Sequence, residues 1–135
     1  PGGPAPEVTM LRISYVGGDS PELIFEGDVL ASQVKHAFDA VVSGPEFARG
    51  HGLVLDATGL SREFSHDEIR AMAAHMAEHR DELGHRLAVV VSPESKLQYG
   101  LARMFSVYAS MHDLTVAIFL DQADATRFIV ASAEA

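Results

Sequence analysis

Thirteen consecutive residues, 56–68 (DATGLSREFSHDE), bring hydroxyl, imidazole and carboxylate side chains together. Such groups serve catalysis, phosphate acceptance or helix capping, so their spacing must decide between these roles. Ser65 precedes Glu68 by three residues, directly before a helical pattern of apolar side chains, which is the capping-box spacing. We expect the Ser65 hydroxyl to accept from the Glu68 amide, while the Glu68 carboxylate accepts from the Ser65 amide. The sequence therefore predicts that this stretch first of all starts a helix.

His75 and His79 stand four residues apart on the helix that follows, a spacing that can hold a metal ion. No third ligand follows at an informative spacing, and a zinc ion needs three or four protein ligands. His85 and His112 have no informative spacing either. The sequence therefore predicts two partly exposed helix histidines, no metal site and no cofactor.

No nucleophile is specified by its surroundings. The Gly18-Asp19-Ser20 triplet falls in a turn-rich segment, and the chain has no Gly-x-Ser-x-Gly elbow, no dinucleotide fingerprint and no Walker-type phosphate loop. Cysteine is absent, which excludes thiolate catalysis and cysteine-based zinc sites. We therefore expect a protein that is not an enzyme.

The charge balance restricts the partners. The chain has 135 residues, with 10 Lys plus Arg against 19 Asp plus Glu, a formal net charge of −9. Nucleic acid and anionic membranes attract basic surfaces, so this composition disfavours both. The longest mostly apolar stretch, 101–120, is interrupted by Arg103, His112 and Asp113, which argues against a membrane span. A cytoplasmic location is the simplest expectation.

The elements that must position these groups follow from hydrophobic periodicity and turn residues. We expect residues 1–9 to form a loose tail and residues 10–131 to form a single domain. The expected strands are 8–15, 22–26, 53–57, 86–92 and 114–120, the first two joined as a hairpin by the turn 17–21. The expected helices are 29–43 (capped by Asp28), 66–83, 93–111 and 122–131. The pattern predicts an α/β fold with about five strands, mostly parallel, an N-terminal hairpin and about four helices.

In such a sheet, helices begin at the carboxyl edge of the strands, where ligands of open α/β sheets bind. The capped helix starts near Ser65 and at 92–93 should therefore meet at one rim. The residues expected to line this ligand or partner rim are Asp56, Thr58, Ser61, Arg62, Ser65, His66, Ser92, Ser95 and Lys96. Loop residues that simply face water are the alternative interpretation.

The helix expected at 93–111 offers a second surface. Tyr99 and Arg103 lie four residues apart and, with Ser106, are expected to face away from the apolar stripe. Tyr and Arg are enriched among interface hot spots, so Tyr99 and Arg103 are the preferred candidates for contact with a partner. A solvated helix face is the alternative.

Three segments in this order support a family resemblance: 53–60 (LVLDATGL), 86–92 (RLAVVVS) and 99–129, which contains the Gly-x-Ala-Arg-Met-Phe pattern at 100–105. Together with the N-terminal hairpin, they resemble the SpoIIAA-like family. This is the superfamily of STAS domains, which shares its core with CRAL-TRIO lipid-binding domains. The resemblance covers roughly residues 10–129 and implies a SpoIIAA-like (βα) superhelix.

STAS antagonists are switches in which a kinase phosphorylates a serine at the start of the helix after an Asp-containing strand. In this chain, Asp56 and Thr58 stand at the matching strand end, and 65–68 (SHDE) occupies the place of the usual Asp-Ser-Ser-Gly-like quartet. His66 falls nearest the phospho-acceptor position, and the loop is one residue longer. This departure argues against a serine-phosphorylation switch.

Two functions from different classes are compatible with these features. The first is a STAS-like regulatory or protein-interaction module, whose acidic character favours a basic partner. The alternative is a carrier of a small molecule or lipid, as the resemblance to lipid-binding domains implies. Its apolar pocket would be bordered by Phe64, Met72, Met104 and Phe105, although all four also fit an ordinary core. A homodimer is compatible with either function.

Overall fold

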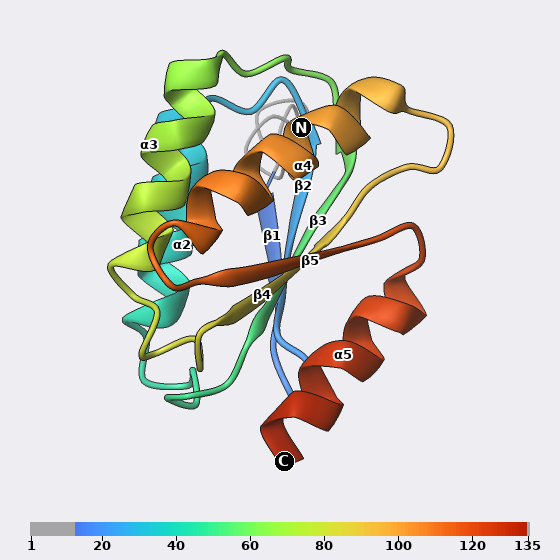
Figure 1. The fold of residues 1–135 in the computed structure, drawn as a ribbon. Coiled ribbons are helices and arrows are strands. Elements are labelled where there is room, and N and C mark those ends of the chain that lie inside the picture. Colours follow the sequence, from blue (N-terminus) through green and yellow to red (C-terminus); the bar gives the residue numbers. More distant parts are fainter. Residues whose placement is uncertain (1–12, 135) are drawn as a thin grey trace, which may run out of the picture.

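The computed structural model describes residues 13–134 and shows a five-stranded sheet between two unequal helical layers (Figure 1). The strands are β1 (Ile13–Val16), β2 (Glu22–Gly27), β3 (Leu53–Leu60), β4 (Arg86–Val90) and β5 (Thr115–Phe119). They lie in sequence order, with β1 antiparallel to β2 and all other neighbours parallel. The predicted α/β fold with an N-terminal hairpin is therefore confirmed. Positions 8–12 of the first predicted strand lie outside the described residues.

The helices divide between the two faces of the sheet. Helices α2 (Ala31–Val42), α3 (His66–Ala77) and α4 (Lys96–Ser110) lie together on one face, and α5 (Gln122–Glu134) covers the other (Figure 1). Each parallel connection contains one helix, as expected for crossovers in an α/β sheet. The three-helix layer therefore buries the main core.

Alternation along β3 explains the two cores. Leu53 and Leu55 belong to the main core under the three helices, whereas Val54 packs with Ile129 on the α5 face. Successive side chains of a strand point to opposite faces, and a strand buried on both faces reads as a continuous apolar run. Strand β3 extends three residues beyond the predicted end because it continues to pair with β2, with Gly59 beside Glu26.

The start of α2 differs from the prediction. The N-cap residue is Leu30, not Asp28, and the Leu30 amide donates to the Gln33 side chain at 2.8 Å. The Asp28 carboxylate instead lies 2.9 Å from Nε of Arg62. Asp28 therefore joins the segment before α2 to the segment that follows β3.

The α3 helix ends at Ala77, earlier than the predicted position 83. Beyond it, the amides of His79 and Arg80 bond to carbonyls three residues back, at 3.0 and 3.1 Å. These tighter turns lead to Gly84, whose φ of +64° lies in the left-handed region that glycine tolerates. The apolar pattern continues past the helix because Leu83 is still fully buried.

The α4 helix begins later than predicted, at Lys96 instead of position 93. The Ser95 hydroxyl accepts from the Gln98 amide at 3.0 Å, so Ser95 is the N-cap. The Ser92 hydroxyl accepts from the Glu94 amide at 3.3 Å and supports the turn that precedes the cap. A serine was thus expected at this helix start, but the capping residue is Ser95.

Candidate functional site

The capping box at the start of α3 is present. The Ser65 hydroxyl accepts from the Glu68 amide at 3.1 Å, and the Glu68 carboxylate accepts from the Ser65 amide at 2.9 Å. Asp67 and Glu68 also place negative charge in the first helical turn, where the helix dipole is positive. The polar stretch therefore serves the helix start, as its spacing predicts.

The structure divides the predicted rim between the two faces of the sheet. Asp56 lies close enough to Glu22, on the α5 side, to affect its ionisation, and Asp56 Oδ1 accepts from the Thr58 amide and hydroxyl at 3.0 and 2.7 Å. Arg62 and Ser95 instead line a pocket on the three-helix side. Asp56 faces the α5 side because side chains alternate along β3, whereas Arg62 and Ser95 lie beyond the strand on the other side, so these rim residues do not all converge on one ligand.

The remaining rim residues are mostly exposed. Ser61, Ser65, His66 and Lys96 are exposed, whereas Ser92 is partly buried. These residues therefore cap a helix or face the solvent, and they do not line the pocket.

Gln98 is the structural link that the sequence analysis missed. Its amide nitrogen donates to the carbonyls of Thr58 and Leu60 at 3.0 and 3.1 Å, and its amide oxygen accepts from the Ser92 amide at 2.7 Å. One side chain on the first turn of α4 thus ties the ends of β3 and β4 together. A glutamine on a helical pattern gives no sign of such bonds, because they depend on where two strands end.

An apolar pocket lies beneath this link, between the sheet, α3 and α4, with a volume of about 120 Å³. Among the described residues that line it, three are polar: Arg62, Ser95 and Gln98. The apolar lining comes from strands β2 to β4, helices α2 to α4 and the segments that follow β3 and β4. These residues are Phe25, Val34, Leu55, Ala57, Leu60, Phe64, Ile69, Met72, Met76, Val89, Val91, Leu97, Leu101, Ala102 and Phe105.

The structure brings three of the four predicted pocket residues together. Phe64, Met72 and Phe105 line the pocket, whereas Met104 packs against the main core outside the lining. Leu97 lines the pocket and is nevertheless 47% exposed, which marks the side on which the pocket meets the solvent.

The outer surface of α4 carries Tyr99 and Arg103, both exposed, as predicted. Ser106 differs from the prediction because its hydroxyl donates to the Val116 carbonyl of β5 at 3.0 Å and so faces the sheet. The cation–π contact in this region joins Arg70 to the Tyr108 ring, at 5.2 Å from the ring centroid.

Glu22 is a buried acidic residue at the start of β2, only 5% exposed. Burial raises the pKa of its carboxyl; the nearby Asp56 charge acts in the same direction, and a hydrogen bond donated by Gln122 opposes both. Its Oε2 atom is buried and has no hydrogen-bond partner among residues 13–134. This carboxyl lies on the α5 side of the sheet, opposite the face that carries the pocket.

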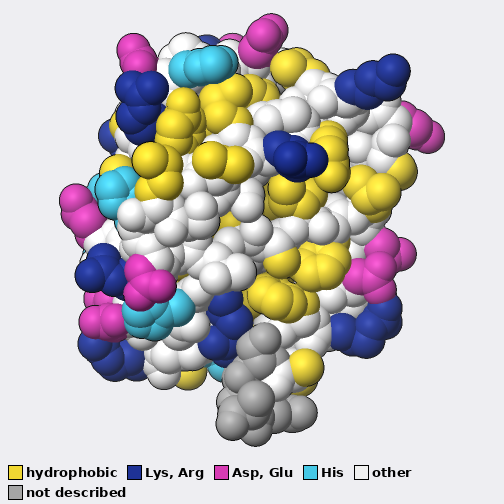
Figure 2. Space-filling view, viewed as in Figure 1, with side chains coloured by type: hydrophobic (Ala, Val, Ile, Leu, Met, Phe, Trp, Pro, Cys, Tyr) yellow, Lys and Arg dark blue, Asp and Glu magenta, His cyan; other side chains and the backbone are white. Residues whose placement is uncertain are grey.

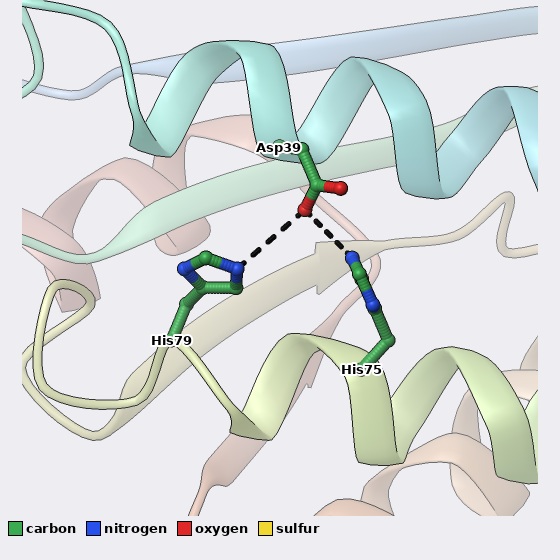
Figure 3. Close-up of side chains that lie close together, drawn as sticks. All are labelled: Asp39, His75 and His79. Carbon is green, nitrogen blue, oxygen red and sulfur yellow. Dashed lines mark hydrogen bonds and ion pairs between the residues drawn. The ribbon is translucent and has the colours of Figure 1, made fainter.

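A cluster of Asp39, His75 and His79 joins α2 to the end of α3 (Figure 3). Asp39 Oδ1 lies 2.6 Å from His75 Nε2 and 3.6 Å from His79 Nε2. Both histidines are partly exposed, as predicted, but His79 lies in the turn after α3. Sequence spacing offered no third ligand, whereas the packing of α2 on α3 supplies one 36 residues before His75.

The class of protein that this arrangement defines is the SpoIIAA-like α/β fold, with its N-terminal hairpin, parallel strands and one helix alone on the second face. A structural neighbour is an uncharacterized protein of the DUF3478 family with a SpoIIAA-like fold, from Shewanella loihica PV-4. The two are 15% identical with a TM-score of 0.54, over 87% of this chain and 91% of the other. The sequence matches no family model and no curated protein. The likeness therefore shows the fold alone.

Among residues 13–134, every helix is too short or too polar to cross a membrane.

Proposed function

We propose that this chain is a binding module of SpoIIAA-like fold that takes a small apolar ligand in the pocket between β3, α3 and α4. The observation that carries the proposal is a cavity of about 120 Å³ whose lining is apolar apart from three residues. Well-packed interiors leave few voids larger than a water molecule, so a cavity of this size needs an explanation. Ligand sites are typically apolar pockets with a few polar groups at fixed positions.

The size of the cavity sets the class of ligand. An engineered apolar cavity of about 150 Å³ stays dry and binds benzene. The present cavity, at about 120 Å³, is suited to one ring or a short branched alkyl group. A longer molecule would have to leave its remainder outside the mouth, beside the exposed Leu97.

The charge at the pocket favours an acidic head group. Arg62 is the one charged residue among the described lining residues, and its side chain is 27% exposed. Asp28 pairs with its Nε at 2.9 Å. A guanidinium is planar and has five N–H donors, which suits it to binding a carboxylate. The proposed ligand is therefore a small apolar or aromatic carboxylate.

Ligand-observed NMR with benzoate and hexanoate tests this proposal, with benzylamine as the probe of opposite charge. Ala57→Leu adds three carbons to a residue that lines the pocket, and we expect it to weaken binding at least about tenfold, or about 1.4 kcal/mol. Ala71→Leu makes the same change on the exposed side of α3 and should leave binding unchanged. Absence of carboxylate binding, or equal loss in both variants, would count against a ligand pocket.

A second candidate function, recognition of a protein partner, is favoured by the surface of α4. Tyr99, Val107 and Met111 follow one another at multiples of four residues and are 43%, 55% and 72% exposed. Arg103 occupies the missing position of this series. Figure 2 shows hydrophobic side chains gathered on the molecular face that carries α4. Net charge of −9 favours a basic partner.

Arg103→Glu tests this surface, because it reverses the charge at the centre of the exposed series. We expect it to abolish capture of the native partner from cell extract, while Arg49→Glu, an exposed arginine in the loop before β3, should not. Sedimentation of both variants distinguishes a homodimer from a heterologous partner. Unchanged capture by Arg103→Glu would remove α4 from the interface.

A non-enzymatic role in the cytoplasm completes the proposal. It is supported by the absence of cysteine and of any Gly-x-Ser-x-Gly elbow in the sequence, and by the use of Ser65 as a helix cap. If the purified protein turned over an ester or phosphate substrate and Ser65→Ala abolished this activity, the proposal of a non-enzymatic role would be wrong.

A further inference from the structure

Asp39, His75 and His79 place one carboxylate and two imidazoles where two helical segments meet (Figure 3). Their nearest ligand atoms all lie within 4.8 Å of one another. We propose that these three residues bind a divalent transition-metal ion of the Zn²⁺ type. This site is separate from the apolar pocket, because none of the three residues lines that pocket.

Both distances to the Asp39 carboxylate fit an ion after small side-chain movements. Zinc binds imidazole nitrogen and carboxylate oxygen at about 2.0–2.2 Å, which places tetrahedral ligand atoms roughly 3.3–3.6 Å apart. The His79 Nε2 to Asp39 Oδ1 distance is 3.6 Å, within this range. The His75 Nε2 to Asp39 Oδ1 distance is 2.6 Å, a hydrogen bond that must open by less than about 1 Å to admit the ion.

The histidine rings are already held in orientation. The second ring nitrogen of His79, Nδ1, lies 3.4 Å from Oε2 of Glu82. Metal-binding histidines commonly direct their other ring nitrogen to a carboxylate, which fixes the tautomer and the ring orientation. The Phe38 ring packs edge-on against both imidazoles, with centroids 6.3 Å from His75 and 5.6 Å from His79. Glu82 is therefore the positioning residue of the site.

The ligand types select the metal. Two imidazoles suit zinc, copper, nickel or iron, whereas magnesium and calcium prefer all-oxygen sites. Three protein ligands leave one coordination position open to water or to an external donor. The side chains of His75, His79 and Asp39 are 27%, 24% and 43% exposed, so an ion can reach them from the solvent. Bound there, it would clamp α2 to the end of α3.

Titration of tag-free protein with ZnCl₂ and with CoCl₂ tests the site directly. We expect one ion per chain, a tetrahedral Co²⁺ absorption band in the visible region, and a rise in the Tm with Zn²⁺ that is absent with Mg²⁺. Asp39→Asn and His79→Gln should each weaken Zn²⁺ binding at least about tenfold, and Glu82→Gln should have a smaller effect.

His66→Gln is the matched control, because His66 lies exposed at the other end of α3. Binding retained in His66→Gln and lost in Asp39→Asn or His79→Gln supports the site. Circular dichroism confirms that each variant is folded, and two independent ligand variants keep the test decisive if one does not fold. No stoichiometric binding, or binding that none of the ligand substitutions weakens, would show that the cluster is only an inter-helix ion pair.

Discussion

Helix α3 makes apolar contacts on one side and polar contacts on the other. Toward α4 it presents Met72 and Met76, which line the apolar pocket, and toward α2 it and the turn after it present His75 and His79, which meet Asp39. The apolar side is incompletely filled, whereas the polar side is held by close contacts between a carboxylate and imidazoles. One helix therefore contributes to a cavity that can admit an apolar group and to a cluster that can admit an ion.

The difference shows where each kind of site obtains its stability. Methionine side chains are unbranched and adaptable. Met72 and Met76 can therefore adjust to a pocket that is only partly filled. The polar cluster depends instead on the buried ring beneath it, since Phe38 is fully buried and touches both imidazoles. We expect mutations to separate these two sides by the size and type of their effects.

Phe38→Ala should have the largest effect, a loss of about 3–4 kcal/mol in the free energy of unfolding. The ring is 0% exposed, and its removal leaves a cavity and also takes away the support of both histidines. Urea denaturation measures the loss. His36→Ala, on the exposed side of the same helix, should change stability by less than about 0.5 kcal/mol. A small loss for Phe38→Ala would mean that α2 is held mainly by the polar cluster.

Met72→Ala should lower the free energy of unfolding by about 2–3 kcal/mol, less than Phe38→Ala. Met72 is 4% exposed but already borders empty space, so the substitution removes fewer close contacts and enlarges the pocket. Larger aromatic carboxylates should then bind better than benzoate in the NMR assay. Met111→Ala, at a residue 72% exposed, is the control and should be nearly neutral. Equal losses for Met72→Ala and Phe38→Ala would remove the contrast between the two sides.

The two sides also differ in how far the sequence predicts them. Met72 and Phe105 repeat at helical spacing, so their meeting over the sheet follows from periodicity and layer packing. Asp39 lies 36 residues before His75, and only the position of α2 on α3 brings the two together. Gln98 escaped prediction for the same reason, because its three partners belong to the ends of β3 and β4.

Local signals succeeded where a few neighbouring residues decide the outcome. The Ser65–Glu68 capping box was predicted because both partners lie within one helical turn. Asp28 shows the limit of such signals. It has a typical capping side chain, but α2 starts after Leu30, and the carboxylate pairs with Arg62 across a tertiary contact.

Ser65→Ala should lower the free energy of unfolding by about 1 kcal/mol, because the Glu68 amide loses its capping acceptor. Because the cap supports the whole helix, Ser65→Ala should weaken metal binding on one side of α3 and carboxylate binding on the other to a similar extent. Thermal denaturation together with the metal and carboxylate titrations measures this. Ser61→Ala, an exposed serine in the preceding segment, is the control. Loss of binding on one side alone would place Ser65 within that site.

Glu22→Gln contrasts a buried charge with the half-exposed charge of Asp39. Burial raises the pKa of Glu22 above its ordinary value of 4.5, so the folded state binds this proton more tightly than the unfolded state. Stability from this group is therefore lost as the pH rises from 4.5 through the raised pKa, and the penalty persists above it. Glutamine keeps an oxygen acceptor for Gln122 and should raise stability by about 1 kcal/mol at pH 7.

The gain from Glu22→Gln should disappear at pH 4, where the wild-type carboxyl is protonated in the folded state. Urea denaturation at both pH values tests the sign of the effect. Glu26→Gln, on an exposed residue of the same strand, should show no such gain. Destabilisation at pH 7 would mean that the ionised Glu22 is held by attractive contacts outweighing its burial.

Asp39→Asn should have the smallest effect on the metal-free protein, a loss of about 0.5 kcal/mol. The Asp39 side chain is 43% exposed and that of His75 27% exposed, so water screens their attraction, and asparagine keeps an oxygen at the contact. A double-mutant cycle with His75→Gln in the presence of a chelator isolates this coupling energy. Because the pair contributes so little to folding, a much larger stability difference between the wild type and Asp39→Asn when Zn²⁺ is present would come from the bound ion. A coupling energy above about 2 kcal/mol without metal would instead make the polar side of α3 as important to folding as the apolar side.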